Sequence, residues 1–160
     1  MNDDAKSLSK DWMRQLQENG YRTTGPRQAV VNIISSSQHV LRPLDVYELA
    51  RQYHPSIGLV TVYRTVEKLE ELGLIQRVHQ PSGCHAFIAA TKGHQHLLIC
   101  QKCGRAEAFS GDRMEALIAN VGQESGYKVS EHWLQLFGVC NDCQGKKSAG
   151  TDGRTDTGAV

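Results

Sequence analysis

Apolar residues in the first half of the chain recur at the spacing of an α-helix. Leu8, Trp12 and Leu16 lie on one face of a predicted helix over about 8–19, and Gly20 ends it. The same periodicity and the positions of the prolines predict three further helices, which begin near Thr24, near Pro43 and near Thr61, the last running to about Leu72.

The fourth predicted helix has one apolar and one polar face. Its buried stripe is expected to consist of Val62, Val66, Leu69 and Leu72, and its outer face to carry Thr61, Arg64 and Lys68 with Tyr63 at the edge. After Gly73 the pattern predicts a strand over 74–79, a turn over 80–83 and a returning strand over 84–88. This is the winged-helix arrangement, which most often reads the DNA major groove through its last helix.

The second half of the chain alternates between short strands and one helix. Strands are predicted over 96–100, 106–109 and 132–137, and a helix over 112–125 with inward-facing Met114, Leu117, Ile118 and Val121. Residues after Gln144 lack apolar periodicity and are predicted to be disordered. The sequence therefore predicts an α+β protein with a winged helix-turn-helix domain over 1–88, a small α/β dimerisation domain over 89–144, and a tail over 145–160.

The composition leaves DNA binding undecided. The 160 residues include 18 Lys and Arg against 17 Asp and Glu, a net charge of +1, whereas nucleic-acid-binding domains are usually plainly basic. No apolar run approaches the roughly 18 residues of a membrane span, and the polar N-terminus is unlike a secretory signal. We therefore expect a cytoplasmic protein without a membrane partner.

Four of the five cysteines form two C-x-x-C pairs, Cys100/Cys103 and Cys140/Cys143. Each pair lies at a predicted strand end followed by a turn, so the four thiolates can converge on one ion. Four thiolates at tetrahedral angles suit zinc and leave no coordination position open, which predicts a structural site. The alternative is a thiol–disulfide switch, because a C-x-x-C pair can also cycle oxidatively.

Histidines and one acidic residue provide a second candidate metal site. His94 and His96 lie two residues apart, on the same side of an extended segment, and can hold one metal. Glu115 and His132 lie on a predicted helix and strand that can pack beside them. Each residue taken singly is an ordinary surface residue, but together they form a nitrogen- and oxygen-rich set that suits a reversibly bound divalent metal.

The predicted hairpin adds two candidate ligands. His79 and Cys84 flank its turn, and we expect them to be cross-strand partners with side chains on one face. His85 shares the opposite face with Phe87 and is the weaker candidate, as is His39. A small buried hydrophobic residue is the alternative interpretation of Cys84.

In combination, these motifs resemble those of the ferric uptake regulator family over about 16–143. The resemblance rests on Thr24-Gly25-Pro26-Arg27, Thr61-Val62-Tyr63-Arg64-Thr65, His94-x-His96 followed by Cys100-x-x-Cys103-Gly104, and Gly138-x-Cys140-x-x-Cys143. It implies a homodimer with an N-terminal winged helix, a C-terminal dimerisation domain and a metal corepressor. The implied partner is a double-stranded DNA operator of metal-uptake or stress genes.

The resemblance also implies roles for individual residues. The residues that match the family's DNA-binding positions are Arg22, Arg27, Thr61, Tyr63 and Arg64. Those that match one of its regulatory metal sites are His94, His96, Glu115 and His132. The family's other, hinge-type site departs from the pattern, because Ile88, Ala89 and Ala90 stand where many members carry Glu, Asp or Cys. His79 and Cys84 are our candidates to replace it.

The ligand types discriminate among the metals that the family senses. A thiolate beside imidazoles favours zinc, whereas Fe²⁺ and Mn²⁺ sites usually prefer carboxylate and imidazole. We therefore predict a zinc-responsive repressor of metal-uptake genes, with Zn²⁺ both as structural metal and as corepressor. An iron-responsive regulator using Fe²⁺ or Mn²⁺ is the alternative. A zinc hydrolase is a remote alternative, because four cysteines leave no open position for catalysis.

Overall fold

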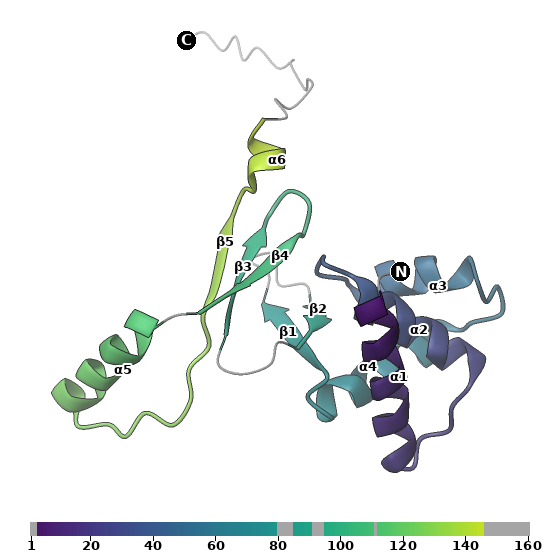
Figure 1. Cartoon of the computed structure of the whole chain (residues 1–160), viewed down its shortest axis with the longest axis horizontal. Helices are drawn as coiled ribbons and strands as arrows, with labels where there is room; N and C mark the ends of the chain where they lie inside the picture. Colours follow the sequence, from purple (N-terminus) through teal and green to yellow (C-terminus); the bar gives the residue numbers. More distant parts are fainter. Residues whose placement is uncertain (1–2, 80–84, 91–94, 111, 146–160) are drawn as a thin grey trace, which may run out of the picture.

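The computed structural model describes residues 3–79, 85–90, 95–110 and 112–145. Figure 1 shows a helical unit, a β-hairpin beside it, and a second sheet from which one helix projects. This is the predicted α+β class, with the helical winged unit first and the smaller unit second. Within the described residues, no helix has the length and apolar character needed to cross a membrane.

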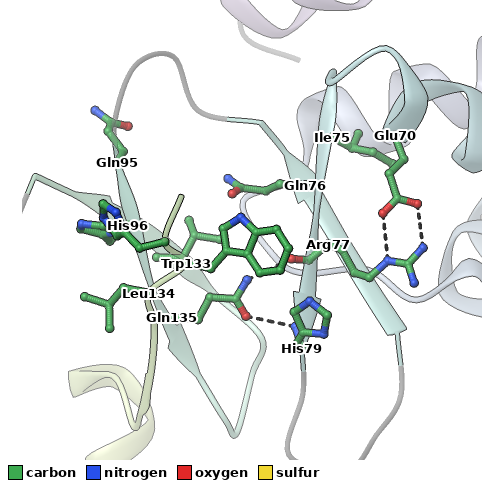
Figure 2. A pocket seen from close by; sticks show the side chains of 12 residues that line it. Glu70, Ile75, Gln76, Arg77, His79, Gln95, His96, Trp133, Leu134 and Gln135 are labelled. Carbon is green, nitrogen blue, oxygen red and sulfur yellow. Dashed lines mark hydrogen bonds and ion pairs between the residues drawn. The ribbon is translucent and has the colours of Figure 1, made fainter. Parts of the chain in front are cut away.

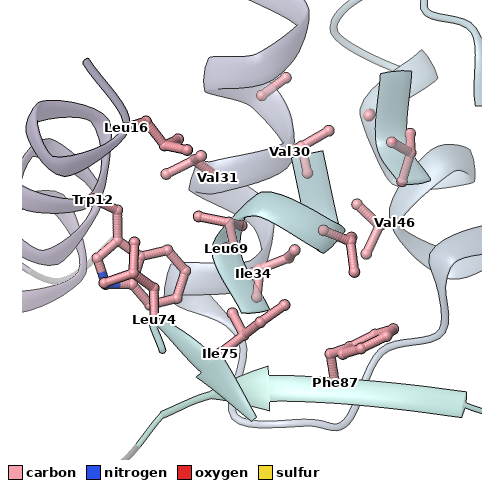
Figure 3. Packing of buried hydrophobic residues seen from close by; sticks show 14 of the residues in the cluster. Trp12, Leu16, Val30, Val31, Ile34, Val46, Leu69, Leu74, Ile75 and Phe87 are labelled. Carbon is pink, nitrogen blue, oxygen red and sulfur yellow. The ribbon is translucent and has the colours of Figure 1, made fainter. Parts of the chain in front are cut away.

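The first unit consists of the four predicted helices, with small shifts at their ends: α1 (Asp3–Glu18), α2 (Gly25–Ser36), α3 (Pro43–Arg51) and α4 (Leu59–Glu71). α1 begins earlier than predicted because its first turn carries Asp3 and Asp4, which stabilise the positive end of the helix dipole. α2 begins after Thr24, whose hydroxyl accepts the Arg27 N–H at 3.4 Å. The helices share one core around Trp12, Leu16, Val30, Ile34 and Leu69 (Figure 3).

α4 has the two faces that the sequence predicts. Val62, Val66 and Leu69 are buried, and Leu72, just beyond the helix, is partly buried. Gly73, with φ of 66°, ends the helix in the left-handed conformation that glycine adopts most readily. The opposite face of α4 stays exposed at the surface of the unit.

The hairpin consists of β1 (Ile75–His79) and β2 (His85–Ala89), which pair antiparallel. The expected pairing of His79 with Cys84 is wrong by one residue, because His79 lies opposite His85. The register is set by burial: Val78 and Ala86 lie opposite each other, and both are fully buried. His79 and His85 therefore share a face, and Cys84 lies outside the described residues.

The second unit contains a three-stranded sheet in the order β4-β3-β5, together with two helices: β3 (His96–Cys100), β4 (Ala106–Phe109), α5 (Asp112–Ser125), β5 (Gln135–Gly138) and α6 (Asn141–Gln144). β3 pairs antiparallel with β4 and parallel with β5. β5 begins later than the predicted strand over 132–137. The predicted tail lies outside the described residues from 146 onward.

α5 has the predicted bounds but a different environment from the one expected. Leu117 and Val121, which we expected to face inward, are 55% and 50% exposed in the single chain. Figure 1 shows why, because α5 projects away from both the sheet and the helical unit. The apolar face of α5 therefore has the character of a surface that a second chain covers.

The two units are joined by the hairpin and by the segment 38–41 between α2 and α3. The outer face of the hairpin, with Val78, Ala86 and Ile88, packs against Leu97 and Ile99 of β3. Segment 38–41 hydrogen-bonds to β2 on one side, through the reciprocal Leu41–Phe87 pair at 2.8 and 2.9 Å. On its other side it bonds to the chain around β4, through Val40 N–H to Gly104 O at 2.8 Å and Ala106 N–H to Gln38 O at 3.0 Å.

Candidate metal centres and DNA-binding surface

The four cysteines of the two C-x-x-C pairs converge at the end of the second unit. The Sγ atoms of Cys100, Cys103, Cys140 and Cys143 all lie within 4.8 Å of one another. A tetrahedral zinc site with Zn–S bonds of about 2.3 Å has S···S edges of roughly 3.8 Å. The Cys103 and Cys140 sulfurs lie 3.8 Å apart. The donor set and its spacing therefore fit zinc, as the sequence predicts.

Local backbone geometry brings each cysteine pair to the site. In the first pair, Gly104 adopts φ of 76° and donates its N–H to the Cys100 carbonyl at 2.8 Å, which closes the turn. In the second pair, Cys140 caps the short helix α6, so that Cys143 lies one turn later. The Arg105 side chain bonds Asp142 at 3.0 Å, and this ion pair connects the two turns.

The thiols interact strongly with one another. The backbone N–H of Cys140 donates to the Cys100 sulfur at 3.3 Å, and this and neighbouring N–H groups lower the pKa of Cys100 to about 6. Hydrogen bonding to Cys140, burial and the other thiols raise the pKa of Cys143 to about 12. Four sulfurs this close cannot all ionise without a compensating cation, which a zinc ion supplies when bound.

Two of the four residues of the predicted regulatory site are in contact. His96 is 4% exposed at the start of β3, and its ring centroid lies 5.3 Å from that of His132 and 5.5 Å from that of Phe109. His94 lies outside the described residues. The structure therefore places His132 beside His96, as the sequence predicts for this pair.

The same histidines line a cleft of about 530 Å³ between the hairpin and the second unit. Figure 2 shows His79 reaching into it from β1, opposite His96 and Trp133. The rings of His79 and Trp133 are stacked with centroids 6.4 Å apart. His79, His96 and His132 therefore face one cleft, although they come from three segments far apart in the sequence.

Glu115 is exposed and lies away from this cleft. It lines a second, open cavity of about 750 Å³, which it shares with His132, so His132 lies at the border of both. Within the described residues, the four cysteines are the one set of three or more metal-binding side chains whose ligand atoms have converged. The described histidines and Glu115 therefore do not form a single coordination sphere in this structure.

Two residues of the cleft, Trp133 and Gln135, were not singled out from the sequence. Trp133 is 84% exposed, and the Gln135 side chain bonds the backbone of β1. The sequence does indicate that Trp133 and Gln135 lie on the same side of an extended segment, because they are two residues apart. It does not indicate what they contact, because their partners in β1 lie more than 50 residues earlier in the chain.

The predicted DNA-contacting residues lie on and next to α4. Tyr63 is 44% exposed, Arg64 is exposed and Thr61 is half-buried, so all three reach the outer face of the helix. Val60, in the first turn of α4, is 62% exposed on the same helix and was not singled out from the sequence.

The two basic residues near α2 differ from each other. Arg22 is exposed, whereas Arg27 is half-buried and donates its guanidinium to the Arg22 carbonyl. The Arg27 guanidinium also lies over the Tyr21 ring, 6.0 Å from its centroid. Arg27 thereby orders the segment that leads into α2.

Comparison with known proteins identifies the family. A sequence model of the ferric uptake regulator family matches residues 18–137. The chain belongs to the ferric uptake regulator family. Its relatives include the ferric uptake regulation protein of Neisseria meningitidis serogroup A, which is 32% identical over 133 residues, covering 82% of this chain and 92% of the relative.

Solved structures agree with this assignment. A zinc-bound manganese uptake regulator shares 26% identity and a TM-score of 0.63, covering 86% of this chain and 98% of that one. The Helicobacter pylori ferric uptake regulator has a TM-score of 0.69 at 24% identity, covering 90% of this chain and 96% of that one. At this identity the likeness supports the fold alone. As a ferric uptake regulator family member, the chain is a metal-responsive, DNA-binding transcriptional regulator that acts as a dimer, and it is not an enzyme.

Proposed function

We propose that this regulator is a zinc-responsive repressor of metal-uptake genes that acts in the cytoplasm. The observation that carries the proposal is the cleft between hairpin and second unit, which His79, His96 and His132 face together. Imidazole nitrogens suit zinc, and Cys84, a further proposed ligand that lies outside the described residues, would add a thiolate.

The charge environment of the cleft supports zinc over iron or manganese. Glu70 is the one carboxylate among the described residues that line it, and both of its oxygens accept hydrogen bonds from Arg77 at 2.8 Å. The cleft therefore offers nitrogen ligands and a carboxylate already engaged by a guanidinium. Fe²⁺ and Mn²⁺, which favour carboxylate oxygen, find a poorer ligand set there.

An iron-responsive regulator is the second candidate function. The curated relatives are named ferric uptake regulation proteins. In this chain, His132 also borders the cavity of Glu115, which offers a carboxylate. A site assembled from His94, His96, Glu115 and His132 would suit Fe²⁺ or Mn²⁺ better than the His79 cleft does.

Repression follows from fixing the position of the recognition helix. The residues that we propose for DNA contact are Arg22, Arg27, Thr61, Tyr63 and Arg64. A dimer must hold its two α4 helices about 34 Å apart to enter successive major grooves. A metal held between His79 of the hairpin and the histidines of the second unit favours that one arrangement, and DNA affinity rises because less ordering remains for binding.

A metal titration tests the proposal. The protein would keep its structural zinc, be stripped of weakly bound metal, and be titrated separately with Zn²⁺, Fe²⁺ and Mn²⁺ while operator DNA binding is followed by fluorescence anisotropy at fixed salt. We expect buffered zinc at sub-nanomolar levels to switch binding on. If iron or manganese activated DNA binding and zinc had no effect beyond the structural site, the zinc-responsive function would be wrong and the iron-responsive regulator would take its place.

A further inference from the structure

The Gln135 side chain connects the second unit to the open edge of the hairpin. β1 pairs with β2 along one edge, and its other edge faces the cleft. There the Gln135 amide nitrogen donates to the Arg77 carbonyl at 2.9 Å, and its amide oxygen accepts the His79 N–H at 3.0 Å. Figure 2 shows the bond between Gln135 and the backbone of His79.

This pair of bonds reproduces one rung of a β-ladder. Residues 77 and 79 present a carbonyl and an N–H to the same edge of β1, as alternate residues of a strand do. A carboxamide carries one acceptor and one donor at matching separation, so it satisfies both groups at once. Gln135 is also the first residue of β5 and lies opposite Leu97 of β3, so its backbone belongs to the sheet of the second unit.

The segment that carries Gln135 also carries a proposed metal ligand. His132 lies three residues before Gln135, beside His96, and Trp133 between them stacks on His79. On the hairpin side, the Arg77 side chain bonds Glu70 of α4 through two hydrogen bonds of 2.8 Å. A continuous series of contacts therefore runs from the histidines through Gln135 and β1 to the recognition helix.

We propose that Gln135 is a positioning residue that transmits metal binding at the histidines to the orientation of the winged helix. The inference rests on the proposed function, and it adds a group that touches neither metal nor DNA. A metal that fixes His132 fixes the backbone leading into β5, and the Gln135 carboxamide then holds β1 and α4 in the DNA-binding orientation. Without metal, His132 leaves this segment less restrained, so the Gln135 carboxamide holds β1 less firmly beside the second sheet.

The substitution Gln135→Met tests the proposal, because it keeps the side-chain length and removes both hydrogen bonds. The matched control is Gln144→Met, which removes a similar amide-to-carbonyl bond, to Val139 at 2.6 Å, within the second unit. For each protein the measured quantities are metal affinity by tryptophan fluorescence, dimer mass, melting temperature, and operator affinity with and without the activating metal.

For Gln135→Met we expect metal affinity, dimer mass and melting temperature close to those of the original protein. Operator affinity should fall on the order of tenfold in the metal-loaded state, as the loss of one to two ordinary hydrogen bonds predicts, and stay unchanged in the metal-free state. Gln144→Met should change neither. Gln135→Asn, whose shorter side chain cannot reach both backbone groups, should give the same pattern with less disturbance of packing.

Two outcomes would overturn the positioning role. One is an unchanged operator affinity of the metal-loaded Gln135 variants. The other is an equal loss with and without metal, which would make Gln135 a part of the fold only. These experiments use whichever ion activates the original protein. If the zinc assignment is wrong, the original protein will respond to a different ion. If the role of Gln135 is wrong, the original protein will behave as proposed and only the Gln135 variants will deviate from the expected result.

Discussion

Arg64 and Arg27 both belong to motifs that resemble those of the family, but their surroundings in the structure differ. Arg27 is half-buried, donates to the Arg22 carbonyl and lies over Tyr21. Arg64 is exposed on the outer face of α4. A guanidinium in that position can pair bidentately with guanine or bind phosphate, so Arg64 is the arginine that we expect to read a base, while Arg27 also orders the segment that leads into α2.

Replacing Arg64 with alanine should weaken operator binding without destabilising the fold. We expect a loss of about 1–3 kcal/mol in binding free energy, or roughly 5- to 150-fold in affinity, if Arg64 contacts a base. The control is Arg14→Ala, because Arg14 is an exposed arginine of α1 and its loss changes the net charge equally. Anisotropy titrations at fixed salt measure both variants, and equal losses would reduce Arg64 to a contributor of general charge.

The sequence predicted the cysteine site well and the histidine site only in part. Each cysteine pair depends on a local turn that its C-x-x-C spacing predicts, and the two pairs meet because β3 and β5 are neighbours in the sheet. His79 was assigned the wrong cross-strand partner because a hairpin register can shift by one residue without any change in the periodicity of its strands. Gln135 was missed because its partners in β1 become neighbours only after both units have packed together.

At the scale of elements, the recognition helix and the hairpin are held together by an ion pair. Glu70 of α4 and Arg77 of β1 form two hydrogen bonds of 2.8 Å, and the Arg77 guanidinium lies 5.6 Å from the centroid of Phe87. Arg77 holds the pKa of Glu70 below its ordinary value. About a third of each side chain is exposed, so solvent screening keeps the stabilisation below about 1 kcal/mol.

The substitution Glu70→Gln should therefore cost stability in a pH-dependent way. Because the pKa of Glu70 is lowered by folding, its contribution is fully present above roughly pH 4.3, the ordinary glutamate value, and is lost as the pH falls through the lowered pKa. Urea midpoints should differ between variant and original at pH 7 and converge in acid. The control is Glu67→Gln, on the exposed face of the same helix, whose urea midpoint should differ from that of the original protein by the same small amount at both pH values.

Element types were more predictable than their surroundings. The periodicity of α1 to α4 and the Gly73 boundary indicated the helical unit correctly, because each helix buries one stripe against its neighbours. The predicted environment of α5 was wrong, since Leu117 and Val121 follow a helical stripe but remain exposed among the described residues. An apolar stripe indicates that one face of a helix is buried. It does not indicate whether the residues that bury it come from the same chain or from a second chain.

At the scale of the whole molecule, we expect the four-cysteine site to determine whether the second unit folds. Cys140→Ser removes one of four ligands, and we expect loss of the structural zinc, of the unfolding transition of the second unit and of the dimer. Structural zinc contributes on the order of 10 kcal/mol to the folding of small zinc-binding domains. Metal analysis, calorimetry and sedimentation measure these three losses.

The fifth cysteine provides the control for this experiment. Cys84→Ser should keep the structural zinc and the transition, because Cys100, Cys103, Cys140 and Cys143 already supply the four ligands of a tetrahedral site. As a proposed regulatory ligand, it should raise the metal concentration needed for operator binding. An unchanged metal response would remove Cys84 from the regulatory site, and a second unit that melts normally without zinc would contradict the structural assignment.

The segment 38–41 makes the two halves of the chain inseparable as pieces. Gln38 and Val40 bond the residues around Gly104, and the hairpin residues Val78 and Ala86 pack against the second sheet. A fragment cut after the hairpin would expose both an unpaired strand edge and an apolar face, which together favour aggregation. We therefore expect that the winged-helix unit cannot be fused to another sensor domain unless that domain also supplies the surface that the second sheet provides here.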